Sequence, residues 1–333
     1  MNTLRKLLAG LACALLAGCA GLTHDDEVRA LAVGATKSEP ASRQALERLA
    51  TQGDAVAQHY MGLLYITGRG EPHNEEKAAE WFARSAAQGH IESAHNLGVI
   101  HERSPGALRD LAAAHKWYRI AAERGFARAQ TNLGHLLTEG SGAPQDLPAA
   151  RAWLEKAAAQ SEPYAQYLLA KMYLDGRGVS RDAASAAKLL RASAEAGERE
   201  ARYRLGLLYG SGEGVPKDGK AAVGWLLKAA QQQHADAQYT VAAIYSHGMH
   251  GQLQDHATAL EWLKKAALQE HAAAQFALGL AFAEGRGTEQ NMQEAGIWFN
   301  KAAKNGDPQA IGLMTRVRQM ENRVVPAWPA LPK

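Results

Sequence analysis

The apolar positions of this chain recur with a period of 36 residues over most of its length. Aligned on the pattern Ala-Gln-x-x-Leu-Gly, the units begin at Asp54, His90, Phe126, Glu162, Glu198, His234 and His271. Each unit has 36 residues except the sixth, which has 37, and together they cover residues 54–306. Counted from zero, positions 3, 7, 8 and 11 of each unit fall on one side of a helix. Self-similarity at a fixed period of this kind is typical of repeat proteins.

Each unit is predicted to contain two helices joined by a turn. Position 8 of the first helix is glycine or alanine in every unit, and position 11 is Tyr, His, Leu or Phe. Glycine in mid-helix costs about 0.5–1 kcal/mol relative to alanine, so close approach of a neighbouring helix must require it. The second helix carries a tryptophan in six of the seven units. Pairs such as Gly68 and Gly70 supply positive φ for the turn between the helices.

A single helical hairpin cannot bury its faces alone, and stacking of neighbouring hairpins completes the core. The chain is therefore predicted to be all-α, a right-handed α-solenoid of seven helix-turn-helix repeats. We expect an N-terminal capping helix over 44–53 and a polar C-terminal capping helix over 307–323. The tail 324–333 has a proline at every third residue, which favours polyproline II, and we expect Trp328 to pack it against the last repeat.

The motif A-x-A-Q-x-x-L-G-x-x-Y-x-x-G-x-G-V, followed by A-x-x-W and A-A-x-x-G, resembles the Sel-1-like repeats, relatives of tetratricopeptide repeats. The resemblance covers all seven units, and the 36-residue unit fits this family better than the 34-residue tetratricopeptide unit. It implies a scaffolding or protein-binding role without a cofactor. Repeat two departs from the pattern, because Ser104-Pro105-Gly106 replaces the Gly-x-Gly turn, so its loop is expected to bend differently.

One face of the first helices is the candidate surface for a protein partner. Positions 2, 6, 9 and 13 point away from the packed side and vary between units. The candidate binding residues are Glu92, Asn96, Arg128, Asn132, His135, Tyr164, Lys171, Glu200 and Arg204, and Asp236 and His247 share these positions. First helices line the concave wall in such solenoids, and that wall commonly binds partners. The alternative is an ordinary solvated helix face.

The N-terminus has the features of an export signal. Arg5 and Lys6 precede an apolar run of 11 residues, Leu7 to Ala17, which is too short to span a bilayer. The run ends in Leu16-Ala17-Gly18-Cys19, which resembles the lipobox of bacterial lipoproteins. This resemblance implies a signal peptide over 1–18, lipidation of Cys19 and a linker over 19–43. Ala20, where an Asp would favour the inner membrane, implies a periplasmic protein anchored to the outer membrane. An ordinary secretory signal with an incidental Cys19 is the alternative.

Composition and charge exclude several classes of function. The 37 Lys and Arg against 34 Asp and Glu leave a formal charge of +3, which argues against a nucleic-acid partner. Thirteen histidines reproduce no metal-binding spacing, and both cysteines lie in the first 19 residues, so we expect no metal site. Ser185-Ala186-Ala187-Lys188 matches the S-x-x-K of penicillin-recognising enzymes, but no K-T-G or S-D-N accompanies it. No other catalytic constellation stands out, and we expect the protein not to be an enzyme.

Three functions are therefore compared. The first is an immunity protein that neutralises a secreted, phospholipase-type effector of type VI secretion, as some Sel-1-like lipoproteins do. The second is a scaffold for an envelope complex such as exopolysaccharide secretion machinery. The third, a hydrolase acting on cell-wall or lactam substrates, is disfavoured by the missing motifs. Protein binding is common to the first two.

Overall fold

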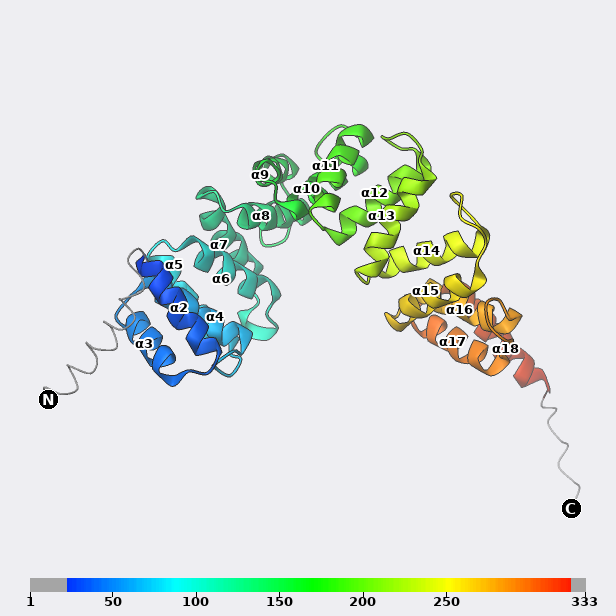
Figure 1. The fold of residues 1–333 in the computed structure, drawn as a ribbon, viewed down its shortest axis with the longest axis horizontal. Helices are drawn as coiled ribbons and strands as arrows, with labels where there is room; N and C mark the ends of the chain where they lie inside the picture. Colours follow the sequence, from blue (N-terminus) through cyan, green and yellow to red (C-terminus); the bar gives the residue numbers. More distant parts are fainter. Residues whose placement is uncertain (1–22, 325–333) are drawn as a thin grey trace, which may run out of the picture. The chain divides into compact units, whose positions relative to one another are not determined.

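The computed structural model describes residues 23–324, with side chains as far as residue 319, and its regular elements are helices (Figure 1). In chain order they are α2 (His24–Thr36), α3 (Pro40–Thr51), α4 (Ala55–Thr67), α5 (Glu75–Ala87), α6 (Ile91–Arg103), the short 3₁₀ helix η1 (Gly106–Leu108), α7 (Leu111–Glu123), α8 (Ala127–Glu139), α9 (Leu147–Ala159), α10 (Pro163–Asp175), α11 (Ala183–Glu195), α12 (Arg199–Ser211), α13 (Gly219–Gln231), α14 (Ala235–His247), α15 (His256–Leu268), α16 (Ala272–Glu284), α17 (Met292–Lys304) and α18 (Pro308–Val324). The predicted all-α solenoid is confirmed.

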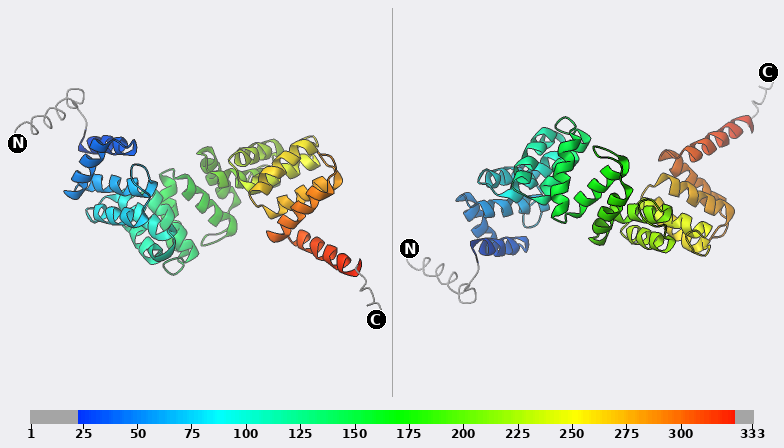
Figure 2. Two further views of the ribbon diagram at one scale, coloured as in Figure 1. Left: turned by 90° about the horizontal axis from the view of Figure 1, so that it is seen from below. Right: turned by 90° about the horizontal axis from the view of Figure 1, so that it is seen from above.

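The described residues divide into two compact units, the first ending at Gln160 and the second beginning at Ser161. In the first unit, α4 packs with α5, α6 with α7 and α8 with α9, and each pair contacts the next. In the second unit the pairs are α10 with α11, α12 with α13, α14 with α15 and α16 with α17. Figure 2 shows these stacked pairs within each unit from two further sides. From α4 to α17, the even-numbered helix is the first helix of a repeat and the odd-numbered helix the second.

A buried glutamine in the first helix explains the repeated Ala-Gln pair. The Gln238 amide nitrogen donates to the Ala230 carbonyl of the preceding second helix at 3.0 Å. The Gln238 carbonyl oxygen accepts from Gln269, which follows its own second helix, at 2.7 Å. One side chain thus joins three consecutive helices, and Gln58, Gln130 and Gln275 make the same two bonds.

The small residue at position 8 receives a side chain from the second helix of the same repeat. A Cβ added to Gly134 would lie 2.7 Å from Leu154 Cγ and 3.1 Å from the Ala150 carbonyl oxygen. The predicted close approach is confirmed, and the side chain one residue after the tryptophan position makes the tightest contact. Ordinary Cβ contacts are longer, so little space remains there for a larger residue.

The turns follow the predicted glycine pattern. Gly68, Gly140, Gly176, Gly212, Gly248 and Gly285 end first helices in the left-handed conformation. The second glycine of the pair packs against the previous repeat: a Cβ on Gly214 would lie 2.2 Å from the Ala183 carbonyl oxygen. In repeat two, extended Ser104 ends α6 and η1 follows, so the expected difference in that loop is confirmed.

The N-terminal part differs from the expectation of a linker over 19–43. Helix α2 occupies His24–Thr36 and packs against α3 and α4, as Figure 1 shows. The capping helix α3 begins at Pro40 rather than at residue 44. Thr23 and Asp26 form a capping box at the start of α2, so the Thr-x-x-Asp spacing was a sequence signal for this helix. The His24 ring also contacts the Asp54 carboxylate at 2.5 Å, which links α2 to the first residue of repeat one.

At the C-terminal end, α18 packs on α17 where the capping helix was predicted. The predicted signal peptide, Cys19 and the tail beyond residue 324 with Trp328 lie outside the described residues. In the part of the chain that the structure describes, no helix is long and apolar enough to cross a membrane.

Candidate functional site

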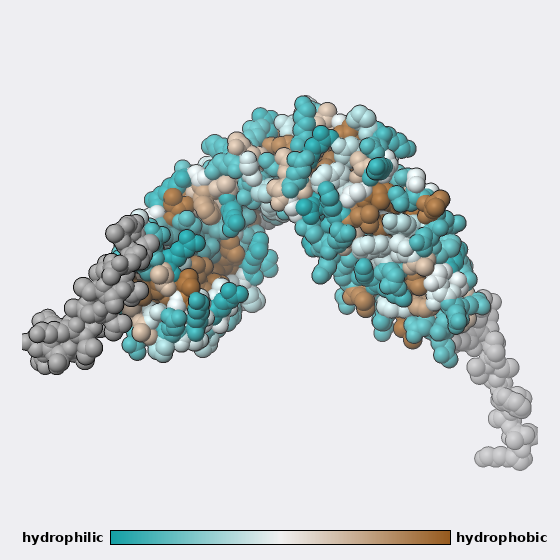
Figure 3. Space-filling model, in the orientation of Figure 1, coloured by the Kyte–Doolittle hydropathy of each residue, from teal (hydrophilic) through white to brown (hydrophobic). Residues whose placement is uncertain are grey.

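The first-helix face is defined here as positions 2, 6, 9 and 13 of the first helices. Its candidate residues lie on four of them: Glu92 and Asn96 on α6, Arg128, Asn132 and His135 on α8, Tyr164 and Lys171 on α10, and Glu200 and Arg204 on α12. None of the nine is buried, and Glu92, Arg128, Lys171 and Arg204 are exposed. The side of each unit that is turned to the viewer in Figure 3 is mostly hydrophilic, and its hydrophobic residues lie in small separate groups.

In the first unit, the first-helix face touches a partly buried histidine. The Asn132 amide nitrogen of α8 lies 3.3 Å from His95 Nε2 of α6. Burial lowers the pKa of His95, so this ring is neutral at physiological pH. Asn132 therefore links two successive repeats as well as facing outward.

In the second unit, acidic residues of this face pair with histidines of the next repeat. Glu200 Oε2 of α12 lies 3.0 Å from Nε2 of His234, the N-cap residue of α14. Nδ1 of His234 accepts the Ala237 backbone N–H, so Nε2 carries the proton that is donated to Glu200. Asp236 and His271 repeat the arrangement at 3.1 Å. Sequence reasoning treated Glu200 and Asp236 as freely varying, whereas the structure gives both a contact between repeats.

Arg204 of α12 also interacts with Tyr167 of α10 in the preceding repeat. Burial raises the pKa of Tyr167, and the positive charge and hydrogen bond of Arg204 partly oppose that rise. The Tyr167 ring stacks on Tyr164, with ring centroids 5.8 Å apart. Arg204 and Tyr164 of the first-helix face thus both contact Tyr167, and together they form a cationic and aromatic group in the second unit.

The second helices carry a different and uniform pattern, which sequence reasoning missed. A cation three residues after the tryptophan lies over its ring in five repeats, 4.0–4.7 Å from the centroid. The pairs are Trp81 with Arg84, Trp153 with Lys156, Trp225 with Lys228, Trp262 with Lys265 and Trp298 with Lys301. The recurring Trp-x-x-Lys or Trp-x-x-Arg spacing was the available signal. Since this feature barely changes between repeats, it belongs to the common frame.

Two hydroxyl groups lie beside a side chain that could act as a base, those of Ser185 and Ser93. Ser185 Oγ donates to Asp182 Oδ2 at 2.6 Å and forms part of the N-terminal cap of α11, which accounts for the S-x-x-K match. Ser93 lies 2.9 Å from His59 and donates to Ser85 at 2.8 Å, but it has no exposed surface. Both hydroxyls serve local packing and capping.

Among residues 23–319, no three His, Cys, Asp or Glu side chains are placed to hold a metal ion. The histidines with described roles instead cap helices or contact neighbouring repeats, as His234 does.

Comparison with known proteins identifies the repeat. The family model of the Sel1 repeat matches residues 55–90, 91–126, 127–162, 163–198, 199–234, 235–271 and 272–307. The matched segments follow one another without a gap and differ by one residue from the units defined by the sequence pattern.

Among solved structures, a Sel1 repeat protein from Oxalobacter formigenes is 31% identical, with a TM-score of 0.67 over 88% of this chain and 87% of that chain. A protective antigen present in uropathogenic Escherichia coli strains is 32% identical, with a TM-score of 0.67 over 81% of this chain. The match covers 58% of the E. coli protein, a little over half of its length. An immunity protein from Pseudomonas aeruginosa is more distant, at 21% identity and a TM-score of 0.47 over 66% of this chain and 83% of that chain. No curated protein matches the sequence.

Proposed function

Because the chain belongs to the Sel1 repeat family, we propose that it binds a protein partner through the first-helix face. One observation carries the proposal: the interior contacts repeat from unit to unit, while the exposed side chains of this face differ. Arg128, Lys171 and Arg204 contribute positive charge, and Glu92 contributes negative charge. A constant frame with varied side chains on one face is the arrangement by which solenoid proteins recognise partners.

We further propose that the protein is a lipoprotein held at the outer membrane and facing the periplasm. The support is the lipobox-like sequence ending at Cys19, with its short preceding apolar run. Several acyl chains give stable anchoring where one would not. Replacement of Cys19 by serine is expected to abolish incorporation of labelled palmitate and to move the protein from the membrane fraction. Unchanged labelling would contradict the anchor.

The specific function proposed is neutralisation of a secreted phospholipase-type effector of type VI secretion. The support is the shared location, because a lipase must act at the membrane and a membrane-anchored binding protein would be present there. Cells without the protein should lose viability in competition with a strain that delivers the effector, and the wild-type chain should restore survival. The triple variant Arg128→Glu, Lys171→Glu, Arg204→Glu should not restore it.

A matched control distinguishes an effect that is specific to the first-helix face from a general effect of reversing three charges. Lys116→Glu, Lys220→Glu and Lys304→Glu reverse three exposed cations on second helices that are not among the five tryptophan pairs, and this variant should restore survival as well as the wild type. Full protection by the first-helix variant would contradict the assignment of the face. Circular dichroism of both variants checks that the helices remain.

The second candidate is a scaffold for an envelope complex such as exopolysaccharide secretion machinery, which the same face would serve. In that case, loss of the protein should reduce polysaccharide export without changing survival against the effector-delivering strain. The least favoured function, a hydrolase of cell-wall or lactam substrates, predicts that Ser185→Ala abolishes hydrolysis of a chromogenic lactam. We expect no hydrolysis by either form.

A further inference from the structure

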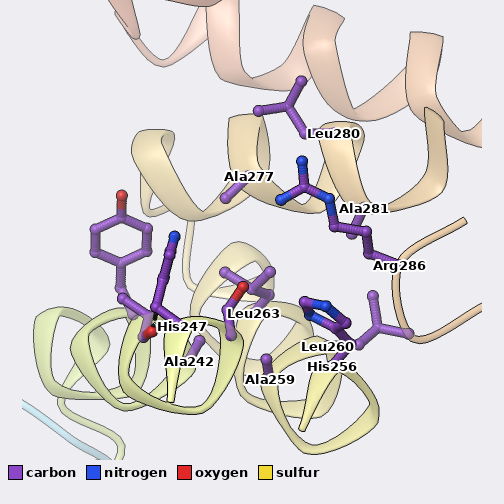
Figure 4. A pocket seen from close by; sticks show the side chains of 13 residues that line it. Ala242, His247, His256, Ala259, Leu260, Leu263, Ala277, Leu280, Ala281 and Arg286 are labelled. Atoms are coloured by element: carbon purple, nitrogen blue, oxygen red, sulfur yellow. Dashed lines mark hydrogen bonds between the residues drawn. The ribbon is translucent and has the colours of Figure 1, made fainter. Parts of the chain in front are cut away.

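A cavity of about 220 Å³ lies between α14, α15 and α16 in the second unit (Figure 4). Its floor is apolar and is formed mainly by Ala242, Ala259, Leu260, Leu263 and Ala281. Figure 4 shows Arg286 extending over this floor from the loop after α16, with His247 on α14 and His256 on α15 near its sides.

The cavity exists because repeats six and seven carry small residues at positions that are usually large. Ala243 occupies position 9, where the other repeats have Leu, Val, His or Lys. Ala277 and Ala281 occupy positions 6 and 10 of repeat seven, where the other repeats have larger residues throughout. The three alanines thus lie around one space, and neighbouring side chains do not fill it.

The opening belongs to the first-helix face. His247 is at position 13 of α14 and Leu280 at position 9 of α16, two of the positions that define this face. Leu280 is 37% exposed, so it adds apolar surface at the opening of the cavity. A partner that covers the first-helix face would therefore also cover this cavity.

The guanidinium of Arg286 at the edge of the cavity can receive a carboxylate. The lining includes Arg286, His247 and His256 and no carboxylate. His247 donates from Nδ1 to the Ala243 carbonyl at 2.9 Å, so Nε2 of the neutral ring is an acceptor for an N–H or O–H group of a ligand. Glu284 outside the lining pairs with Nη2 of Arg286, so the remaining N–H groups of this guanidinium are the donors for an incoming carboxylate.

We propose that this cavity is an anchor pocket for a segment of the protein partner that inserts one aromatic or branched apolar side chain and places a neighbouring carboxylate against Arg286. The size supports a side chain, because pockets for drug-sized ligands usually measure about 300–1,000 Å³. A single large side chain in a desolvated pocket is also the usual form of an interface hot spot. The proposal rests on the proposed function and gives it a partner chemistry.

The test uses the purified full chain in mild detergent and a library of random peptides displayed on phage. The wild-type protein should enrich peptides in which Phe, Tyr, Trp, Leu or Ile lies within two positions of Asp or Glu. Ala243→Leu fills the cavity with the residue that repeats one, five and seven carry at this position, so the helix should tolerate it. This variant should bind a selected peptide with an affinity about tenfold lower, or lower still, than the wild type.

Two further variants keep the test decisive. Arg286→Gln lies in an exposed loop and should remove the preference for acidic peptides while the apolar preference remains. Ala192→Leu adds the same side chain at an exposed position of α11 and should bind the selected peptide as the wild type does. If the wild type and Ala243→Leu enrich the same peptides equally, the pocket proposal is wrong. It is also wrong if the protein binds dodecanoate tightly and selects no peptide.

These outcomes are separable from failure of the proposed function. If Ala243→Leu still protects cells and still captures the wild-type partner, the pocket proposal fails while partner binding stands. If the wild-type chain has no partner on its first-helix face, the proposed function fails whatever the peptides show.

Discussion

Gly98 of α6 lies against the ring of Tyr118 of α7, and a Cβ at residue 98 would be 2.6 Å from Tyr118 Cδ1. Tyr118 has no exposed surface, and its hydroxyl donates to Glu102 at 2.5 Å, so the ring cannot easily move away. In repeats one, two and seven the residue packed on position 8 is aromatic, and position 8 is glycine in all three. Where alanine occupies position 8, as Ala170 and Ala242 do, the equivalent second-helix residue is leucine.

Gly98→Ala should therefore destabilise the protein by about 1–3 kcal/mol, because the added methyl overpacks the contact with a fixed ring. Gly206→Ala should reduce the free energy of unfolding by less, because Gly206 lies opposite Leu226 and alanine already lies opposite leucine at the same position in repeats four and six. Gly224→Ala in α13 meets nothing within 4 Å and should stabilise by about 0.5–1 kcal/mol through its better helix propensity. Urea denaturation measures all three. Equal effects at residues 98 and 224 would contradict the packing account.

Gln238→Ala should destabilise the second unit by about 1–3 kcal/mol, since it removes the hydrogen bonds to the Ala230 carbonyl and from Gln269 and empties the space of a buried side chain. Gln231, exposed at the end of α13, is the matched control, and its replacement by alanine should change stability little. Chemical denaturation followed by circular dichroism makes the comparison. A Gln238 variant as stable as the control would show that the glutamine network does not hold the repeats together.

His59 should make stability depend on pH. Burial, together with the nearby ring of His90 at 4.5 Å, lowers the pKa of His59 to about 3. The unfolded chain binds the proton more readily, with a pKa near 6.5. Stability from this group is therefore complete above about pH 6.5 and falls toward pH 3, by up to about 1.4 kcal/mol per pH unit.

His59→Tyr, which installs the residue found at this position in repeats four to six, should reduce the loss of stability between pH 7.5 and 5.5. Urea midpoints at the two pH values measure the difference. Other buried histidines keep part of the dependence, because the pKa of His95 is also lowered by burial. An unchanged pH dependence in the variant would contradict a neutral, buried His59.

The local features of the fold were predictable because they arise from short patterns. Glycine after a first helix, a small residue at position 8 and a tryptophan in the second helix each have one local cause. Helix α2 was missed because it follows no repeat pattern, although the capping box of Thr23 and Asp26 marks its start. The segment 19–43 was therefore expected to be a linker.

The candidate site was less predictable, because its contacts join residues about one repeat apart. The pairing of Glu200 with His234 depends on how two repeats stack, which position within a helix does not specify. Small residues such as Ala243 are visible in the sequence, but whether neighbours refill the space depends on packing. Helical periodicity thus gives the orientation of a side chain and leaves its partners undetermined.

The central claim is that the first-helix face holds a protein partner, and site-specific photo-cross-linking in living cells tests it most directly. A photoreactive amino acid is placed at residue 128, 171 or 204 of the full chain, and at 156 or 228 on second helices as controls. The account predicts one discrete cross-linked protein, the same from all three first-helix positions and absent from both controls. Cross-links to a protein from the second-helix positions alone, or from none of the five, would contradict it.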